Sequence, residues 1–236
     1  MPPEPGHPLT TTQAEERGAS LALLPVAATI DYYALPDWLQ TQALIQFAPQ
    51  LIAYLAFALW AAQNSTVSSR LGLRKQKLRQ GLWIGLLTGL VLGGLNTVII
   101  LRMFPHLGYD ITFLRQTPHA QLPVFVMVPW FIFSIALFVE LNFRGFLLGR
   151  LVSLESSLWK SGLAQRLSPL ALATSALVFA FDPFMINTFQ HLHWIAVWDG
   201  LIWGWIWIRT GNLYATIVAH AIEVIVMYSA VRSALM

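Results

Sequence analysis

The run WDGLIWGWIWIRTGNLYATIVAHAIEV (residues 198–224) decides the fold, because it places two long apolar stretches on either side of the short polar turn 209–212. A membrane-spanning helix needs about 20 predominantly apolar residues. Extended outward, the two stretches approach that length over residues 192–208 and 213–231. We therefore predict two consecutive membrane helices, joined by a tight turn that carries Arg209.

The rest of the chain has the same character. Of its 236 residues, 56% are hydrophobic and only 11% are charged, whereas a soluble domain carries about 25% charged residues. This composition excludes a soluble enzyme, and the lack of cysteine excludes disulfides and thiolate metal sites. The sequence predicts an all-α fold, a polytopic membrane helix bundle of about seven transmembrane helices. The five further candidate spans are residues 19–35, 41–62, 81–101, 122–149 and 169–186.

Basic residues set the expected orientation. A single integral membrane domain is expected over residues 19–236, preceded by a polar, proline-rich segment, residues 1–18, that we expect to be disordered in the cytoplasm. With that segment inside, the 14 Lys and Arg residues divide 11 inside to 3 outside, as the positive-inside rule favours. We expect an integral protein of a prokaryotic cytoplasmic membrane, with its N-terminus inside and its C-terminus outside. Its expected surroundings are the lipid bilayer, and no nucleic acid.

Ionisable side chains inside the predicted spans are the candidate functional residues, because each costs at least about 2.5 kcal/mol to insert. Glu140 and Arg144 are four residues apart and can pair directly on one helix face. His220 and Glu223 are three residues apart, an arrangement suited to a general base or a metal site. Structural roles stay open beside these: a self-neutralising Glu–Arg pair, or a histidine hydrogen-bonded for helix packing. The full set is Glu140, Arg144, Asp182, Asp199, His220 and Glu223.

Depth along the helices favours one shared polar site. A helix rises about 1.5 Å per residue, so Glu140 lies about 15 Å from Arg150, and Asp199 lies about 15 Å from Arg209. His220 lies at a similar depth on the last helix. For Asp199, which precedes a glycine pair spaced for close helix approach, we expect a structural pairing.

Two stretches carry a resemblance to a known family. FVELNFRGFLLGRL (residues 138–151) resembles the first motif of the CPBP intramembrane proteases, also called the Abi or CAAX prenyl protease family: two glutamates, three residues, then arginine. Residues 200–224 resemble the family's closing segment, an Arg-Thr-Gly turn followed by a helix with a histidine. The likeness covers residues 72–228. It implies a buried site of one glutamate and two histidines, where an activated water cleaves a peptide bond near the membrane.

Carried over residue by residue, the resemblance makes Glu140, Arg144 and His220 the candidate catalytic residues, with Asp182 and Glu223 as auxiliaries. The cofactor is left open by the sequence. If the protein is active, a divalent metal such as zinc is the candidate, with His220, Glu140 and Asp182 as its ligands.

The match to the family motifs is partial. Val139 stands where the family has its first glutamate, usually assigned as the base. The histidine of the second motif is missing, because Pro183 stands four residues after Phe179 and Asp182 four after Val178. Val224 replaces the asparagine of the third motif. Members of a catalytic unit act together, so the loss of one commonly removes most of the rate. We therefore expect weak or absent peptidase activity.

Two functions stay open. The first is a CAAX-type membrane endopeptidase that acts on a membrane-associated peptide, and it needs a water-accessible cavity reaching Glu140 and His220 from the cytoplasmic side. The second is a non-catalytic scaffold that binds another membrane protein through the tryptophan-rich stretch 198–207. An ion carrier is disfavoured, because the polar residues cluster near one level and form no path through both leaflets.

Overall fold

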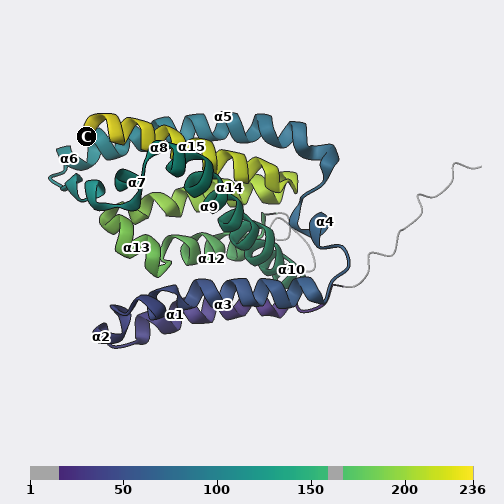
Figure 1. Ribbon diagram of the computed structural model, residues 1–236. Helices are drawn as coiled ribbons and strands as arrows, with labels where there is room; N and C mark the ends of the chain where they lie inside the picture. The colour runs from purple at the N-terminus through teal and green to yellow at the C-terminus, as the bar shows by residue number, and fades with distance from the viewer. Residues whose placement is uncertain (1–15, 159–166, 236) are drawn as a thin grey trace, which may run out of the picture.

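The computed structural model describes residues 16–158 and 167–235, and these ranges form helices joined by turns, without any strand. The helices lie side by side as a bundle (Figure 1). α1 (Leu23–Ala34) and α3 (Ala43–Ala62) run antiparallel along one edge of it. α5 (Leu78–Val98) and α15 (Leu213–Leu235) form the opposite edge. The expected all-α fold is confirmed.

The remaining helices lie between these two edges. The long helix 124–158 consists of α8 (Val124–Val126), α9 (Phe133–Glu140) and α10 (Gly149–Leu158), joined by the π-helical segments Met127–Ile132 and Leu141–Leu148. It is followed by α12 (Pro169–Ala180), α13 (Pro183–Phe189) and α14 (Ile195–Thr210). The short helices are α2 (Asp37–Gln40), α4 (Val67–Leu71), α6 (Phe104–His106) and α7 (Pro118–Gln121).

Within the described residues, four helices are long and apolar enough to cross a membrane: Ala43–Ala62, Val67–His106, Val124–Leu158 and Leu213–Leu235. The pair Pro169–Ala180 and Pro183–Thr210, bent by 51°, raises the count to five if it is one span. The expected number of about seven is thus not confirmed, because the predicted spans 169–186 and 192–208 fall in this bent pair. The first predicted span, 19–35, corresponds to a shorter apolar helix, Ala19–Ala34.

The bend between α12 and α13 has a local cause. Asp182 accepts a hydrogen bond from the backbone N–H of Phe184 at 3.0 Å, which caps α13, and Pro183 occupies the first helical position. A capping aspartate followed by proline favours a new helix start over a continued helix. The span expected over residues 169–186 therefore breaks at Asp182.

A stripe of four glycines holds α5 against α15, and the two helices run parallel. A Cβ added at Gly85 would lie 2.6 Å from the Ala215 carbonyl oxygen, and one at Gly89 would lie 2.6 Å from the Ala219 carbonyl oxygen. Small residues at every fourth position let membrane helices approach closely, where packing replaces the hydrophobic effect as the driving force. The stripe is Gly81, Gly85, Gly89 and Gly93.

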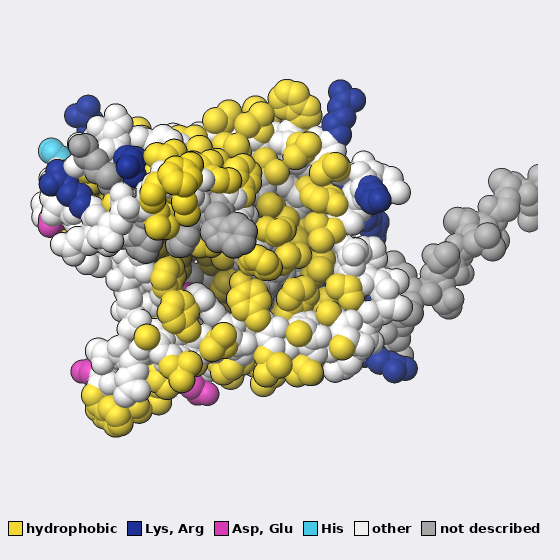
Figure 2. Space-filling view, viewed as in Figure 1, with side chains coloured by type: hydrophobic (Ala, Val, Ile, Leu, Met, Phe, Trp, Pro, Cys, Tyr) yellow, Lys and Arg dark blue, Asp and Glu magenta, His cyan; other side chains and the backbone are white. Residues whose placement is uncertain are grey.

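The bundle has two different ends. The basic end comprises α4, residues 72–77 and the turn 210–212, which are tied together where Asn212 donates to the Lys77 carbonyl at 2.9 Å and Leu213 to that of Gly72 at 3.2 Å. The far end comprises residues 99–123, residues 181–194 and the end of α15. Figure 2 shows hydrophobic side chains over the middle of one face, and Lys and Arg toward its two ends. This apolar surface lies in contact with the lipid bilayer.

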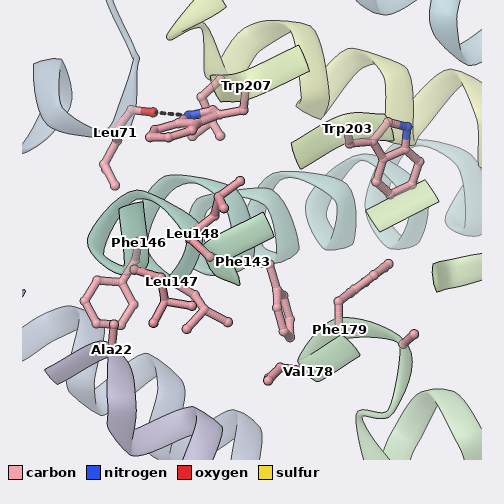
Figure 3. Close-up of a cluster of buried hydrophobic side chains, with 14 of the residues drawn as sticks. Ala22, Leu71, Phe143, Phe146, Leu147, Leu148, Val178, Phe179, Trp203 and Trp207 are labelled. Carbon is pink, nitrogen blue, oxygen red and sulfur yellow. Dashed lines mark hydrogen bonds between the residues drawn. The ribbon is translucent and has the colours of Figure 1, made fainter. Parts of the chain in front are cut away.

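A plug of buried apolar side chains fills the bundle next to the basic end (Figure 3). The indole N–H of Trp207 donates to the Leu71 carbonyl at 3.1 Å and fixes α14 to α4. Phe146 and Leu148, from the π-helical segment, are fully buried in the same cluster. The plug is defined by Leu71, Phe146, Leu147, Leu148, Trp207 and Leu213.

Of the segment expected to be disordered, residues 1–15 lie outside the described residues. Glu16 is described, and it packs against the basic end of the bundle. Its carboxylate pairs with Arg150, lies 3.7 Å from Arg70 and accepts from the Trp60 indole at 3.0 Å. The guanidinium of Arg150 lies 4.2 Å from the Trp60 ring centroid.

Candidate active site

A cavity of about 960 Å³ lies inside the bundle between α3, α9, α13, α14 and α15. Its walls are mainly apolar, as in most sites that bind organic ligands. His220, Glu223, Asp199 and Asp182 all line it, whereas Glu140 and Arg144 do not. Four of the six candidate residues therefore border a space that is large enough for a ligand.

Glu140 is the centre of a buried three-residue cluster. Its Oε1 lies 3.0 Å from Arg144 Nη1 and 3.0 Å from His220 Nδ1, and its side chain is 0% exposed. The expected i, i+4 pair between Glu140 and Arg144 is thus present, and a histidine from another helix joins it. The guanidinium lies close enough to pair directly with the Glu140 carboxylate.

The backbone of the long helix changes at this point. Glu140 is the last residue of α9, and the π-helical segment Leu141–Leu148 begins directly after it. Such wide turns are rare and often occur at functional sites. Val139 lines the cavity, while Glu140, its neighbour, points to Arg144 and His220 instead.

Aromatic rings hold the histidine in place. The ring of Trp203 stacks on the His220 ring, with centroids 4.6 Å apart and planes 23° apart. Phe179 meets the same imidazole edge-on at 6.3 Å, and the Arg144 guanidinium lies 4.3 Å from the Phe179 ring centroid. Rings on two sides limit how the imidazole can turn, so its hydrogen bond to Glu140 sets its orientation.

The two nitrogens of His220 have different roles. When the Nδ1–H of the neutral imidazole donates a hydrogen bond to the Glu140 carboxylate, Nε2 carries the lone pair. His220 is 9% exposed and lines the cavity. A carboxylate on one nitrogen and a cavity beside the ring is the arrangement of a general base oriented by its partner.

A second polar cluster lies in the wall of the same cavity. The Asn96 amide donates to Glu223 Oε1 at 2.7 Å and to Asp199 Oδ1 at 3.2 Å, and its oxygen accepts from the Trp198 indole at 3.0 Å. Asp199 therefore has the structural pairing that the sequence predicted. Asn96 itself was not predicted, because an uncharged asparagine in an apolar run has no signal until its partners are known.

Asp182 lines the cavity but pairs elsewhere, accepting from Gln50 at 2.8 Å. Within residues 16–158 and 167–235, no three His, Asp or Glu side chains are grouped closely enough to hold a metal ion. The predicted ligands Glu140 and His220 do meet, at Glu140 Oε1. The same oxygen is already paired with Arg144. The donor set does not fit zinc, which needs at least three protein ligands.

Comparison with known protein families gives a match to part of the chain. Residues 121–226 match the family model described as type II CAAX prenyl endopeptidase, Rce1-like. The matched range includes Glu140, Arg144, Asp182 and His220, and it confirms the resemblance that the motifs indicated. It begins well after residue 72, so Asn96 lies outside it. No curated protein and no solved structure matches the chain.

Proposed function

We propose that this membrane protein of the CAAX protease type hydrolyses a peptide bond in a membrane-associated peptide, with His220 as the general base. One observation carries the proposal: His220 Nδ1 lies 3.0 Å from Glu140, and the same imidazole lines the cavity of about 960 Å³. The match of residues 121–226 to the endopeptidase family supports the reaction class.

The chemistry follows from the roles of the three residues. His220 Nε2 takes a proton from a water in the cavity, and the water oxygen forms a bond to the carbonyl carbon of the peptide. The Glu140 carboxylate stabilises the imidazolium that results, as the buried acid of a hydrolase triad does. The imidazolium then gives its proton to the departing amine as the carbon–nitrogen bond breaks. Glu140 acts as a positioning residue, because it is fully buried and already paired with Arg144.

This proposal differs from the expectation of weak or absent activity. That expectation rests on Val139, which stands where the family has a glutamate, and on the histidine that is missing near Asp182. The geometry supports a different base, in which His220 acts with Glu140 and needs neither missing group. A cleavage measurement decides between the two.

The test is a proteolysis assay with purified protein on prenylated and unprenylated membrane peptides. We expect cleavage that is abolished in His220→Ala and strongly reduced in Glu140→Gln, because the amide cannot stabilise an imidazolium. Asp110→Asn is the matched control, an acid-to-amide change in an exposed loop, and it should leave cleavage unchanged. Well-folded protein without cleavage would contradict the proposal and favour a scaffold that binds peptides without cutting them.

A further inference from the structure

The cavity lies in one half of the bundle. On α15 its lining starts at His220 and continues to Arg232, close to the end of that helix. On α14 the lining covers the first half, from Ile195 to Trp203. Because α14 begins at the far end and α15 finishes there, the cavity extends from His220 toward the far end.

The route toward the basic end is filled. The plug of Leu71, Phe146, Leu147, Leu148, Trp207 and Leu213 consists of buried side chains on segments that lie closer to the basic connections than His220 does. All of them except Leu213 are labelled in Figure 3. Trp207 and Leu213 are 9% and 0% exposed. Trp207 follows the last residue of α14 that lines the cavity, and Leu213 precedes the first such residue of α15. Both therefore lie on the side of the cavity that faces the basic end. A peptide could reach His220 from the basic end only if this core came apart.

Charge identifies which end faces the cytoplasm. Arg70, Arg74, Lys75, Lys77 and Arg79 all lie at the basic end, and Lys160 and Arg166 lie outside the described residues. The positive-inside rule assigns such an end to the cytoplasm. The far end, where the cavity extends, carries Arg102, Arg115 and Arg232.

We propose that the cavity is loaded from the outer side of the membrane, so that its substrate is the membrane-anchored segment of an exported protein. The peptidase chemistry rests on the proposed function, whereas the side of loading rests on the cavity, the plug and the basic residues. From the sequence, a peptidase is expected to have a cavity that opens to the cytoplasm. In this proposal the cavity opens to the opposite side of the membrane.

The walls match such a peptide. Phe47 on α3 and Phe138 on α9 line the cavity while they are 40% and 54% exposed, so the space also reaches the lipid between these helices. A membrane-anchored chain can enter there without leaving the bilayer. Arg232 lines the cavity near the far end, where its Nη1 donates to the Ala120 and Leu122 carbonyls, and its charge would attract an acidic group on the outer part of the peptide.

Cysteine labelling tests the side of loading directly, because the natural sequence contains no cysteine. The full chain is expressed with one substitution at a time, and right-side-out membrane vesicles are treated with a membrane-impermeant maleimide. The variants are Met227→Cys in the cavity, Asp110→Cys in the exposed far end and Lys75→Cys at the basic end. We expect the first two to react in intact vesicles, and Lys75→Cys to react only after permeabilisation.

Two results would overturn the inference. If Met227→Cys reacts only after permeabilisation, together with Lys75→Cys, the cavity opens to the cytoplasm. If Lys75→Cys reacts in intact vesicles, the orientation is inverted. Should Met227→Cys fail to accumulate, Ser134→Cys on α9 lines the same cavity and replaces it. A cavity cysteine that reacts under neither condition would also contradict loading from the outside.

Labelling needs no turnover, so it separates this inference from the proposed function. If Met227→Cys is labelled from outside but no peptide is cleaved, the proposed peptidase activity is contradicted and the proposed access route is supported. If cleavage depends on His220 but labelling occurs only from the cytoplasmic side, the proposed peptidase activity is supported and access from the outer side is contradicted.

Discussion

Arg144 and His220 meet the same oxygen of Glu140, each at 3.0 Å. In a low-dielectric interior this arrangement depends on the guanidinium, the only fixed positive charge of the three side chains. Arg144 also packs on Phe179 at 4.3 Å and on Trp203 at 5.0 Å. Its side chain therefore carries both the charge balance and part of the packing around the candidate base.

Arg144→Ala is expected to destabilise the protein more than Glu140→Gln does. Each change removes one partner of a buried ion pair, which costs about 3–5 kcal/mol, but Arg144→Ala also loses the packing of the guanidinium on Phe179 and Trp203. Glutamine at position 140 is neutral and still donates and accepts hydrogen bonds. Thermal unfolding in detergent measures the difference, with the exposed Arg79→Ala as a matched control. Greater damage from Glu140→Gln would show that the ion-pair interpretation is wrong.

Asn96→Leu is expected to lower stability by about 1–3 kcal/mol, since leucine has a similar size but leaves buried carboxyl groups without their donor. The partners that lose it are Asp199 and Glu223, at 3.2 and 2.7 Å. A double-mutant cycle with Glu223→Gln isolates the interaction, and contacting residues couple by about 0.5–3 kcal/mol. Additive effects of the two changes would contradict the assigned hydrogen bond.

At the scale of elements, the close approach of α5 and α15 positions both polar clusters. α5 carries Asn96, and α15 carries His220 and Glu223. The glycine stripe sets the separation of the two helices, because a side chain there would meet the α15 backbone. The helix contact is therefore needed for the hydrogen bonds between Asn96 and Glu223.

Gly85→Ala is expected to lower the unfolding temperature, whereas Gly94→Ala leaves it unchanged or raises it slightly. A Cβ at Gly85 would lie 2.6 Å from Val218 Cβ, and one at Gly94 would have nothing within 4 Å. Alanine is favoured over glycine in a helix interior by about 1 kcal/mol, so the control isolates packing from helix propensity. Equal effects at the two positions, measured by thermal unfolding in the same detergent, would exclude the stripe as the packing contact.

For the whole molecule, we expect the N-terminus inside the cell and the C-terminus outside, from the 11-to-3 division of the basic residues. Reporter fusions at both ends measure this. Finding both ends on one side would mean that the number of crossings is even, and the short helix Ala19–Ala34 is the first candidate for a segment that does not cross.

The sequence by itself determined the solvent and the class of fold. An 11% share of charged residues cannot cover a water-facing surface, so long apolar runs must become membrane helices whatever their arrangement. The i, i+4 spacing determined the pairing of Glu140 with Arg144, because both lie on one face of one helix. The motif stretches likewise identified the family that residues 121–226 match.

Only the tertiary structure decided which polar groups meet. His220 reaches Glu140 across 80 residues, and Asn96 reaches Glu223 across 127. Such contacts depend on how each helix is rotated about its axis and how closely the neighbouring helices approach. The separation of two residues in the sequence specifies neither. The break at Asp182 follows from a local signal, an aspartate cap followed by proline. The position of the cavity has no such local signal, because the cavity arises where the packing of five helices leaves a gap on one side of the plug.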